Sequence, residues 1–321
     1  MKGSTKTLLI TAAVLVLVGL VIMGLAYRSA GCDIKGFNNK SFVTKTFDIG
    51  EDFENIAISA DTERITLAPA ADGKCTVEFY MDERKEVSAS VSGDTLNIET
   101  KGKGKWYENF TFLSFDSPKI TVYLPKAEYG ELTVNADTGS VTVPESFSFA
   151  DVGVKLDTGS TQIKASVSGL LRVESDTGSV SLENMTAGSI DVKTDTGSIK
   201  MGSVACDGSI SAVVSTGKTT LTNVTCASLV SRGDTGSITM ENVIASGSIT
   251  IERDTGGVRF QSCDAGEIEI TTDTGDVTGS MLTEKVFITK SDTGSISVPE
   301  STSGGKCKIT TDTGDIRITI G

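Results

Sequence analysis

The sequence predicts an all-β protein, a parallel β-solenoid with coils of about 20 residues behind an N-terminal transmembrane helix. Two observations support this fold class. The first is the motif Asp-Thr-Gly-Ser, which begins at Asp137 and returns, whole or nearly so, every 19 or 20 residues until Asp312. The second is an apolar run near the N-terminus that is long enough to cross a bilayer.

The apolar run covers residues 7–26 and contains no charged side chain. Lys2 and Lys6 precede it, which favours a cytoplasmic stub of residues 1–6 and an extracellular body. We therefore expect a single-pass protein of the cell membrane whose C-terminal domain lies outside the cell.

Residues 27–43 are expected to form a tether between the membrane and the repeats. A cleaved signal peptide is one alternative to a retained anchor. Lipidation at Cys32 is another, because Ser29-Ala30-Gly31-Cys32 loosely resembles a lipoprotein cleavage box.

Each repeat carries two short runs of alternating apolar residues, one before the motif and one after it. Leu132 and Val134 precede Asp137, and Val141 and Val143 follow it. A unit of about 20 residues is too short for a strand-helix-strand crossover, so we expect coils that stack about 4.8 Å apart. The regular coils are predicted over residues 137–321.

The motif itself is interpreted as a tight turn. Its glycine is present in every copy from Gly139 to Gly314, which predicts a positive φ. The Asp side chain is expected to accept backbone N–H groups of its own turn, as in an Asx-turn.

The motif Asp-Thr-Gly-Ser is also the signature around the catalytic carboxylates of aspartic proteases. Those enzymes bring two such loops face to face. Copies stacked along one edge do not oppose each other, so we predict no protease. A polysaccharide-processing enzyme is a further alternative, but it needs paired carboxylates in a cleft. We therefore predict a protein that is not an enzyme and has no cofactor.

Four acids are the only candidates for a metal site, and they are weak ones. A second acid follows the glycine in two coils, which pairs Asp273 with Asp276 and Asp312 with Asp315. We expect loose binding of divalent cations there and a fold that does not require calcium.

Residues 44–136 are predicted to hold degenerate coils and a cap. Ile56 and Ile58 precede Asp61 at the offsets of the later repeats. Residues 101–118 lack the 20-residue repeat and contain several aromatic residues close in sequence to lysines. This insert is expected either to cap the first coil or to bind a ligand, and the binding candidates are Trp106, Tyr107, Phe110, Phe112 and Phe115.

Composition excludes some partners and sites. The chain has a net charge of −13 and no histidine, so no nucleic-acid partner is expected. It has six cysteines and no C-x-x-C pair, which argues against zinc. A disulfide between Cys206 and Cys226 in adjacent coils is possible by distance.

The last coil contains Ile316, Ile318 and Ile320 and is followed by no cap. An uncovered strand edge recruits another chain. We therefore expect self-association through the C-terminal coil.

With the repeat, the N-terminal apolar run and the strand end at Leu124-Pro125 in view, residues 44–321 resemble the bacterial DUF4097 family of adhesin-like β-repeat proteins. The resemblance implies a membrane-anchored module of the cell envelope, adhesin-like or structural, with an unknown envelope polymer or protein as its ligand. The alternative is an ectodomain for envelope stress sensing, which needs a membrane partner because residues 1–6 are too short for a signalling domain.

Overall fold

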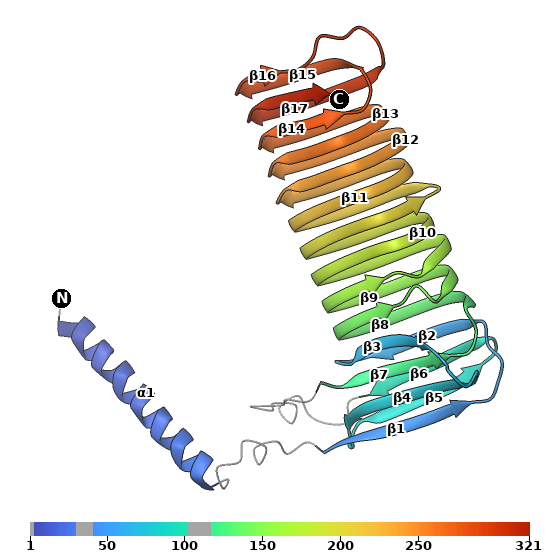
Figure 1. The fold of residues 1–321 in the computed structure, drawn as a ribbon. Helices are drawn as coiled ribbons and strands as arrows, with labels where there is room; N and C mark the ends of the chain where they lie inside the picture. Colours follow the sequence, from blue (N-terminus) through green and yellow to red (C-terminus); the bar gives the residue numbers. More distant parts are fainter. Residues whose placement is uncertain (1–2, 30–40, 102–116) are drawn as a thin grey trace.

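The computed structural model describes residues 3–29, 41–101 and 117–321, and it confirms the predicted fold class. Helix α1 spans Gly3–Ser29, which extends the predicted run 7–26 at both ends. Its segment Ile10–Ser29 is long and apolar enough to cross a membrane, and a signal sequence meets the same criteria. All other described elements are strands of one sheet that winds into a rod of stacked coils (Figure 1).

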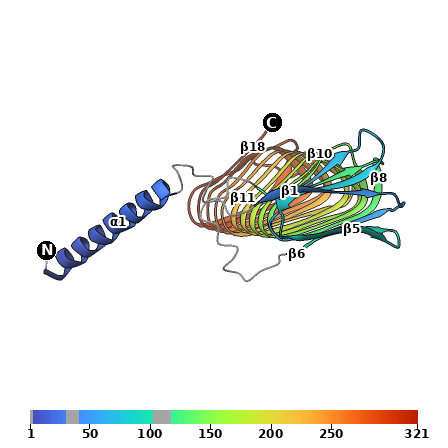
Figure 2. The ribbon, with the colours of Figure 1, turned by 90° about the horizontal axis from the view of Figure 1, so that it is seen from below.

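The coils in the middle of the rod pair in parallel and in register. Thr196 pairs with Thr216, and Gly197 pairs with Gly217, so equivalent residues of the repeat form columns. Seen along the rod, the coils superimpose around a shared core (Figure 2). The strands that form these coils are β8 (Glu128–Val143), β9 (Ser148–Ile163), β10 (Ser166–Cys206), β11 (Ser209–Thr235), β12 (Ile238–Thr255) and β13 (Val258–Thr274).

Each coil has three inward-facing segments, one more than the sequence predicted. The third lies nine and eleven residues after the Asp position, where Val224 and Cys226 are buried. Small or sulfur-containing side chains recur at these two offsets, which explains the positions of several cysteines. The five cysteines of the described residues are buried free thiols, so the structure contains no Cys206–Cys226 disulfide.

The glycine of the motif is required by the stacking of the coils. At Gly197 φ is +155°, a conformation that residues with a side chain rarely adopt. A Cβ atom built there would lie 1.7 Å from the carbonyl oxygen of Gly178 in the preceding coil. The predicted positive φ is confirmed at nine of the ten motif glycines, all but Gly275, and the close approach of two backbones is a second reason for glycine.

The prediction of an Asx-turn is wrong. β8 runs through Asp137–Gly139 without a break, so the chain bends there as a corner within a strand. The Asp side chains of the motif are exposed, and in the described chain none accepts an N–H group of its own turn. Two of them pair with lysines instead, Asp195 with Lys193 and Asp292 with Lys290.

The N-terminal end of the rod is closed by antiparallel strands. β2 and β3 form the first, degenerate coil, which pairs in parallel with β8 as the repeat offsets predicted. β1 and β7 both pair antiparallel with β4, and β5 pairs antiparallel with β6. The strands of this end are β1 (Phe42–Ile49), β2 (Asn55–Ala60), β3 (Arg64–Pro69), β4 (Cys75–Asp82), β5 (Glu86–Ser92), β6 (Thr95–Lys101) and β7 (Lys119–Leu124).

At the other end, the order of the coils differs from their order in the chain (Figure 1). β17 (Gly305–Thr313) pairs in parallel with both β13 and β15 (Lys285–Thr293). β18 (Ile316–Ile320) likewise pairs with both β14 (Val277–Met281) and β16 (Ile296–Ser297). The last coil of the chain therefore lies between two others, and β15 and β16 form the outermost coil.

The prediction that the C-terminal coil is uncovered is wrong for this reason. Ile316 and Ile318 are buried because a coil covers them on each side. Two ion pairs join β17 to β13, with Lys306 Nζ 3.0 Å from Glu267 Oε1 and Lys308 Nζ 2.8 Å from Glu269 Oε1.

Candidate functional site

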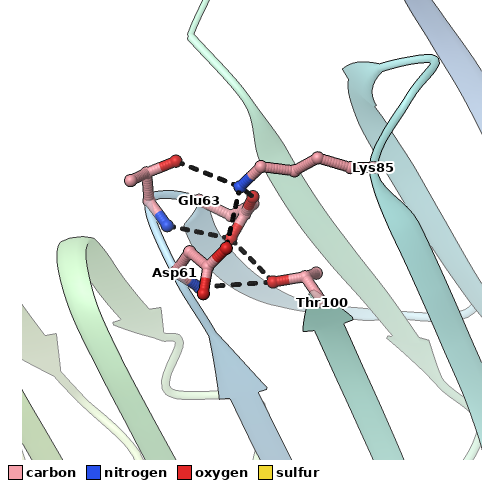
Figure 3. A network of polar contacts seen from close by, with 5 residues as sticks. Asp61, Glu63, Lys85 and Thr100 are labelled. Atoms are coloured by element: carbon pink, nitrogen blue, oxygen red, sulfur yellow. Dashed lines mark hydrogen bonds and ion pairs between the residues drawn. The ribbon is translucent and has the colours of Figure 1, made fainter. Parts of the chain in front are cut away.

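The N-terminal end contains a buried polar network around Glu63 (Figure 3). Glu63 stands where later coils have the glycine of the motif, and its side chain is fully buried. Its Oε2 atom accepts hydrogen bonds from the N–H groups of Asp61 and Thr62 and from Thr100 Oγ1, each at 3.0 Å. Lys85 Nζ lies 2.5 Å from Glu63 Oε1 and 3.4 Å from Asp61 Oδ2.

The network around Glu63 is a structural cap rather than a reactive site. A buried carboxylate is stable only when it is paired and hydrogen-bonded, and both oxygens of Glu63 have partners. Lys85 is held in turn by Asp61 and Thr62 Oγ1. Each of these side chains therefore has a polar partner within the group.

A hollow of about 560 Å³ lies beside this network. Charged side chains of both signs line it, including Lys45, Glu83, Lys85 and Glu99. Lys101, the last described residue before the aromatic insert, also lies on its wall. We assign no ligand to the hollow because the chain that continues from its wall lies outside the described residues.

The aromatic binding candidates also lie outside the described residues, which omit 102–116. In the sequence the insert follows β6 and precedes β7, and both strands lie at the N-terminal end of the solenoid. Ligand binding by Trp106, Tyr107, Phe110, Phe112 and Phe115 stays a prediction.

The structure separates the four acidic candidates into two pairs with different surroundings. Asp276 Oδ1 accepts the N–H of Asp315 at 2.8 Å, and Asp315 Oδ1 accepts the N–H of Ser295 at 2.7 Å. Asp315 also forms an ion pair with Arg317 at 2.5 Å. These bonds, that from the Ser295 N–H above all, hold the pKa of the Asp315 carboxyl below its usual value. Asp276 and Asp315 thus join three successive coils.

Asp273 and Asp312, the other two acidic candidates, are exposed at the corner of the rod. The described chain contains no cluster of three or more side chains with the geometry to hold a metal ion. The column of motif Asp side chains runs along one edge of the stack, so its carboxylates lie side by side and do not face one another across a cleft.

The clearest surface feature of the solenoid is the apolar character of its outermost coil. Large hydrophobic side chains of the described solenoid are exposed at five positions only, and four of these belong to the end formed by β15, β16 and the chain that leads into β15. The four are Leu282, Val286, Ile288 and Ile296, which are 45%, 37%, 51% and 44% exposed, and the fifth is Ile244.

The core is also incompletely covered at this end. Phe287 and Val298 stand at repeat offsets that are buried in the middle coils, but here they are only partly buried. We refer to the outermost coil, residues 285–297, as the free end. An open sheet edge with exposed apolar side chains is typical of an interaction surface.

Sequence reasoning missed the free end because the repeat period continues through it unchanged. One signal was present: Ile288 stands four residues before the Asp, an outward-facing offset that holds Arg172 and Asp191 in other coils. An isoleucine at an outward offset indicates either a covered face or an interaction surface.

These features define a class: a β-solenoid repeat protein with a capped N-terminal end, an open far end and an apolar N-terminal helix. The profile of one family, Toastrack DUF4097, matches residues 53–213, which is 161 of the 321 residues. The chain belongs to this family, as the resemblance of its repeats predicted.

Solved structures that are similar to this chain include two proteins described as a "putative adhesin". The one from Parabacteroides distasonis has 14% identity and a TM-score of 0.52, over 87% of this chain and 98% of its own. The one from Bacteroides fragilis has 14% identity and a TM-score of 0.45, over 88% and 98%. A "putative lipid binding protein" from P. distasonis has 13% identity and a TM-score of 0.47, over 87% and 97%. No curated protein sequence matches the chain.

Proposed function

We propose that the protein is a single-pass surface protein of the cell membrane whose solenoid lies outside the cell and acts as an adhesin-like, non-catalytic module. The observation that carries the proposal is the opposite placement of two features along the rod. The tether from α1 enters at β1, and the open, apolar free end lies at the other end (Figure 1). An anchor at one end presents the other end to partners away from the membrane.

The charge pattern and the relatives support the same proposal. Lys2 and Lys6 favour a cytoplasmic N-terminus, which places everything after α1 outside. The structural relatives named for adhesion support a surface role for this fold. The Asp column has neither a cleft nor opposed carboxylates, which supports a role in binding or as a scaffold rather than in catalysis.

Surface labelling of intact cells tests the placement. Thr302 is exposed in the loop between β16 and β17, and the native cysteines of the solenoid are buried. Cys32 lies in the tether, so it is replaced by serine in both chains. A full chain with Cys32→Ser and Thr302→Cys should react with a membrane-impermeant maleimide on intact cells, whereas the chain with Cys32→Ser alone should not. Labelling only after lysis, or release of the chain into the medium without α1, would contradict an anchored surface protein.

A binding test separates the adhesin-like role from stress sensing. Cells that display the full chain should retain purified wall polymer, membrane vesicles or other cells better than cells without it. If no binding is found and deletion of the chain instead changes the response to envelope damage, the sensor alternative replaces the proposal.

A further inference from the structure

The free end presents unpaired backbone groups whose directions follow from two hydrogen bonds. Asp61 O accepts from Thr138 N of the next coil at 2.7 Å, so the carbonyl at the Asp position faces outward along the stack. Thr293 O accepts from the N–H of Gly314, the residue after β17, at 2.9 Å, so the carbonyl that follows the Asp position faces back into the rod. Peptide groups alternate along a strand, and those of Ile288, Lys290 and Asp292 therefore point away from β17 into solvent.

We propose that the free end binds the free end of a second copy of this chain. In this complex the two β15 strands pair antiparallel about a two-fold axis at Ser291. This inference rests on the proposed function, because it names the partner of the surface that the anchored rod presents. A two-fold contact uses the same patch on both copies, so the patch must be self-complementary.

The charges of β15 meet that condition in one register. With the axis at Ser291, Lys290 of each copy lies opposite the partner's Asp292, which makes two pairs of opposite charge. An axis at Lys290 would place this lysine opposite the partner's Lys290, and an axis at Asp292 would oppose two aspartates. Like charges that are directly opposite destabilise a strand pair, whereas opposite charges stabilise it.

The remaining surface of the molecule favours contact through this end over contact through the sides. The chain carries a net charge of −13, so two rods repel each other when they approach side by side. Residues 282–304 are nearly neutral, with two lysines against three acids. Apolar side chains of the same end, such as Ile288 and Ile296, would leave water in the complex.

Because the chain connects α1 to the opposite end of each rod, at β1, a contact between free ends joins copies that are anchored in two facing membranes. The proposed adhesion is therefore homophilic. It needs no other ligand and no covalent step.

Charge reversal with the full chain in detergent tests the register. Lys290→Asp and Asp292→Lys each oppose like charges in the self-complex, and each should raise the dimer dissociation constant by about tenfold in sedimentation equilibrium. An equimolar mixture of the two variants restores both opposite pairs and should associate as the unmodified chain does. Failure of the mixture to recover, or a monomeric unmodified chain at high micromolar concentration, would overturn the proposal.

A matched pair of isoleucine variants tests the location of the contact. Ile288→Lys should abolish association, and Ile244→Lys should leave it unchanged, because Ile244 is exposed on the middle of the rod. Both side chains point outward, so both variants should keep the far-UV circular dichroism and melting temperature of the parent chain. If both variants lost association equally, the contact would lie elsewhere and the inference would be refuted. Surface labelling at Thr302→Cys is repeated in the Ile288→Lys variant, which should not associate, so failure of this inference stays distinguishable from failure of the proposed function.

Discussion

Replacement of a single motif glycine by alanine tests whether close stacking of the corners holds the rod together. In Gly197→Ala, the new Cβ would stand 1.7 Å from Gly178 O, about half of an ordinary contact distance of roughly 3.4 Å. The oxygen belongs to the backbone of a stacked coil, so it cannot move without disturbing the ladder. The positive φ adds about 1–3 kcal/mol of strain, and two lost backbone hydrogen bonds add about 1–3 kcal/mol. We expect a loss of about 2–6 kcal/mol in the free energy of unfolding.

Gly202→Ala in the same coil is the matched control. Nothing lies within 4 Å of a Cβ built on Gly202. Its free energy of unfolding should change by less than about 1 kcal/mol. Equilibrium unfolding in urea, followed by far-UV circular dichroism, measures both variants, and amide exchange shows whether the damage stays near Gly197. Equal stability of the two variants would refute the close-stacking argument.

Four further predictions follow from the structure. Lys85→Met should cost about 3–5 kcal/mol because it leaves the buried Glu63 carboxylate unpaired, and adding Glu63→Gln should recover part of the loss in a double-mutant cycle. Arg253→Ala should cost about 2–4 kcal/mol, since the buried guanidinium donates to Ser231 Oγ at 2.7 Å; a loss below about 0.5 kcal/mol would refute that role. The pKa of Asp315 is lowered from 3.8, so Asp315→Asn should melt at a lower temperature than the unmodified chain at neutral pH, and this difference should vanish as the pH falls below 3.8. EDTA should leave the melting temperature unchanged, because the described acids form no metal cluster; unfolding by the chelator would contradict this.

The sign of the Asp315 prediction follows from linkage between protonation and folding. Hydrogen bonds from Ser295 lower the pKa of the folded carboxyl, so the unfolded chain binds a proton more readily. The stabilisation is complete well above 3.8 and is lost as the pH falls through the lower pKa of the folded state. A difference that grows as the pH falls would contradict the role of Asp315 in joining the coils.

The stacked coils were predictable because the repeat is a local pattern. Alternating apolar residues around each motif determine which side chains enter the core, and the glycine column marks the corner where two backbones meet. The third inward segment was harder to recognise, since its two positions hold residues as different as Val224, Cys226 and Met185. Its residues share a small or adaptable shape rather than a β-branched composition.

The order of the last coils was not predictable from the period. The Asp positions 273, 292 and 312 keep the usual spacing, although the coil of Asp312 lies between the other two in space. Charged side chains of distant segments meet in this order, as in the ion pairs Lys306–Glu267 and Lys308–Glu269. A single sequence shows such pairs only once the stacking order is known, which is why the wrong coil was expected to be uncovered.

The Asx-turn prediction failed because the motif was treated as an isolated turn. In a stack, the backbone groups of a corner bond to the coils above and below, so they do not need a side chain. Thr311 Oγ1, one residue before the motif, donates to Gly275 O of the neighbouring coil at 3.2 Å. The Asp side chain of the motif therefore points into solvent.

We propose that α1 anchors the protein in the membrane and that the free end of the rod projects away from the membrane. Strands stacked at about 4.8 Å from β1 to β16 give a rod of about 60 Å, and residues 30–41 add at most about 40 Å. Electron cryo-microscopy of vesicles that carry the full chain with Cys32→Ser, and with gold coupled to Thr302→Cys, measures the distance of the free end from the bilayer directly. The structure predicts gold at about 60–100 Å from the membrane surface. Gold within about 30 Å would show a rod that lies along the membrane and would contradict the account.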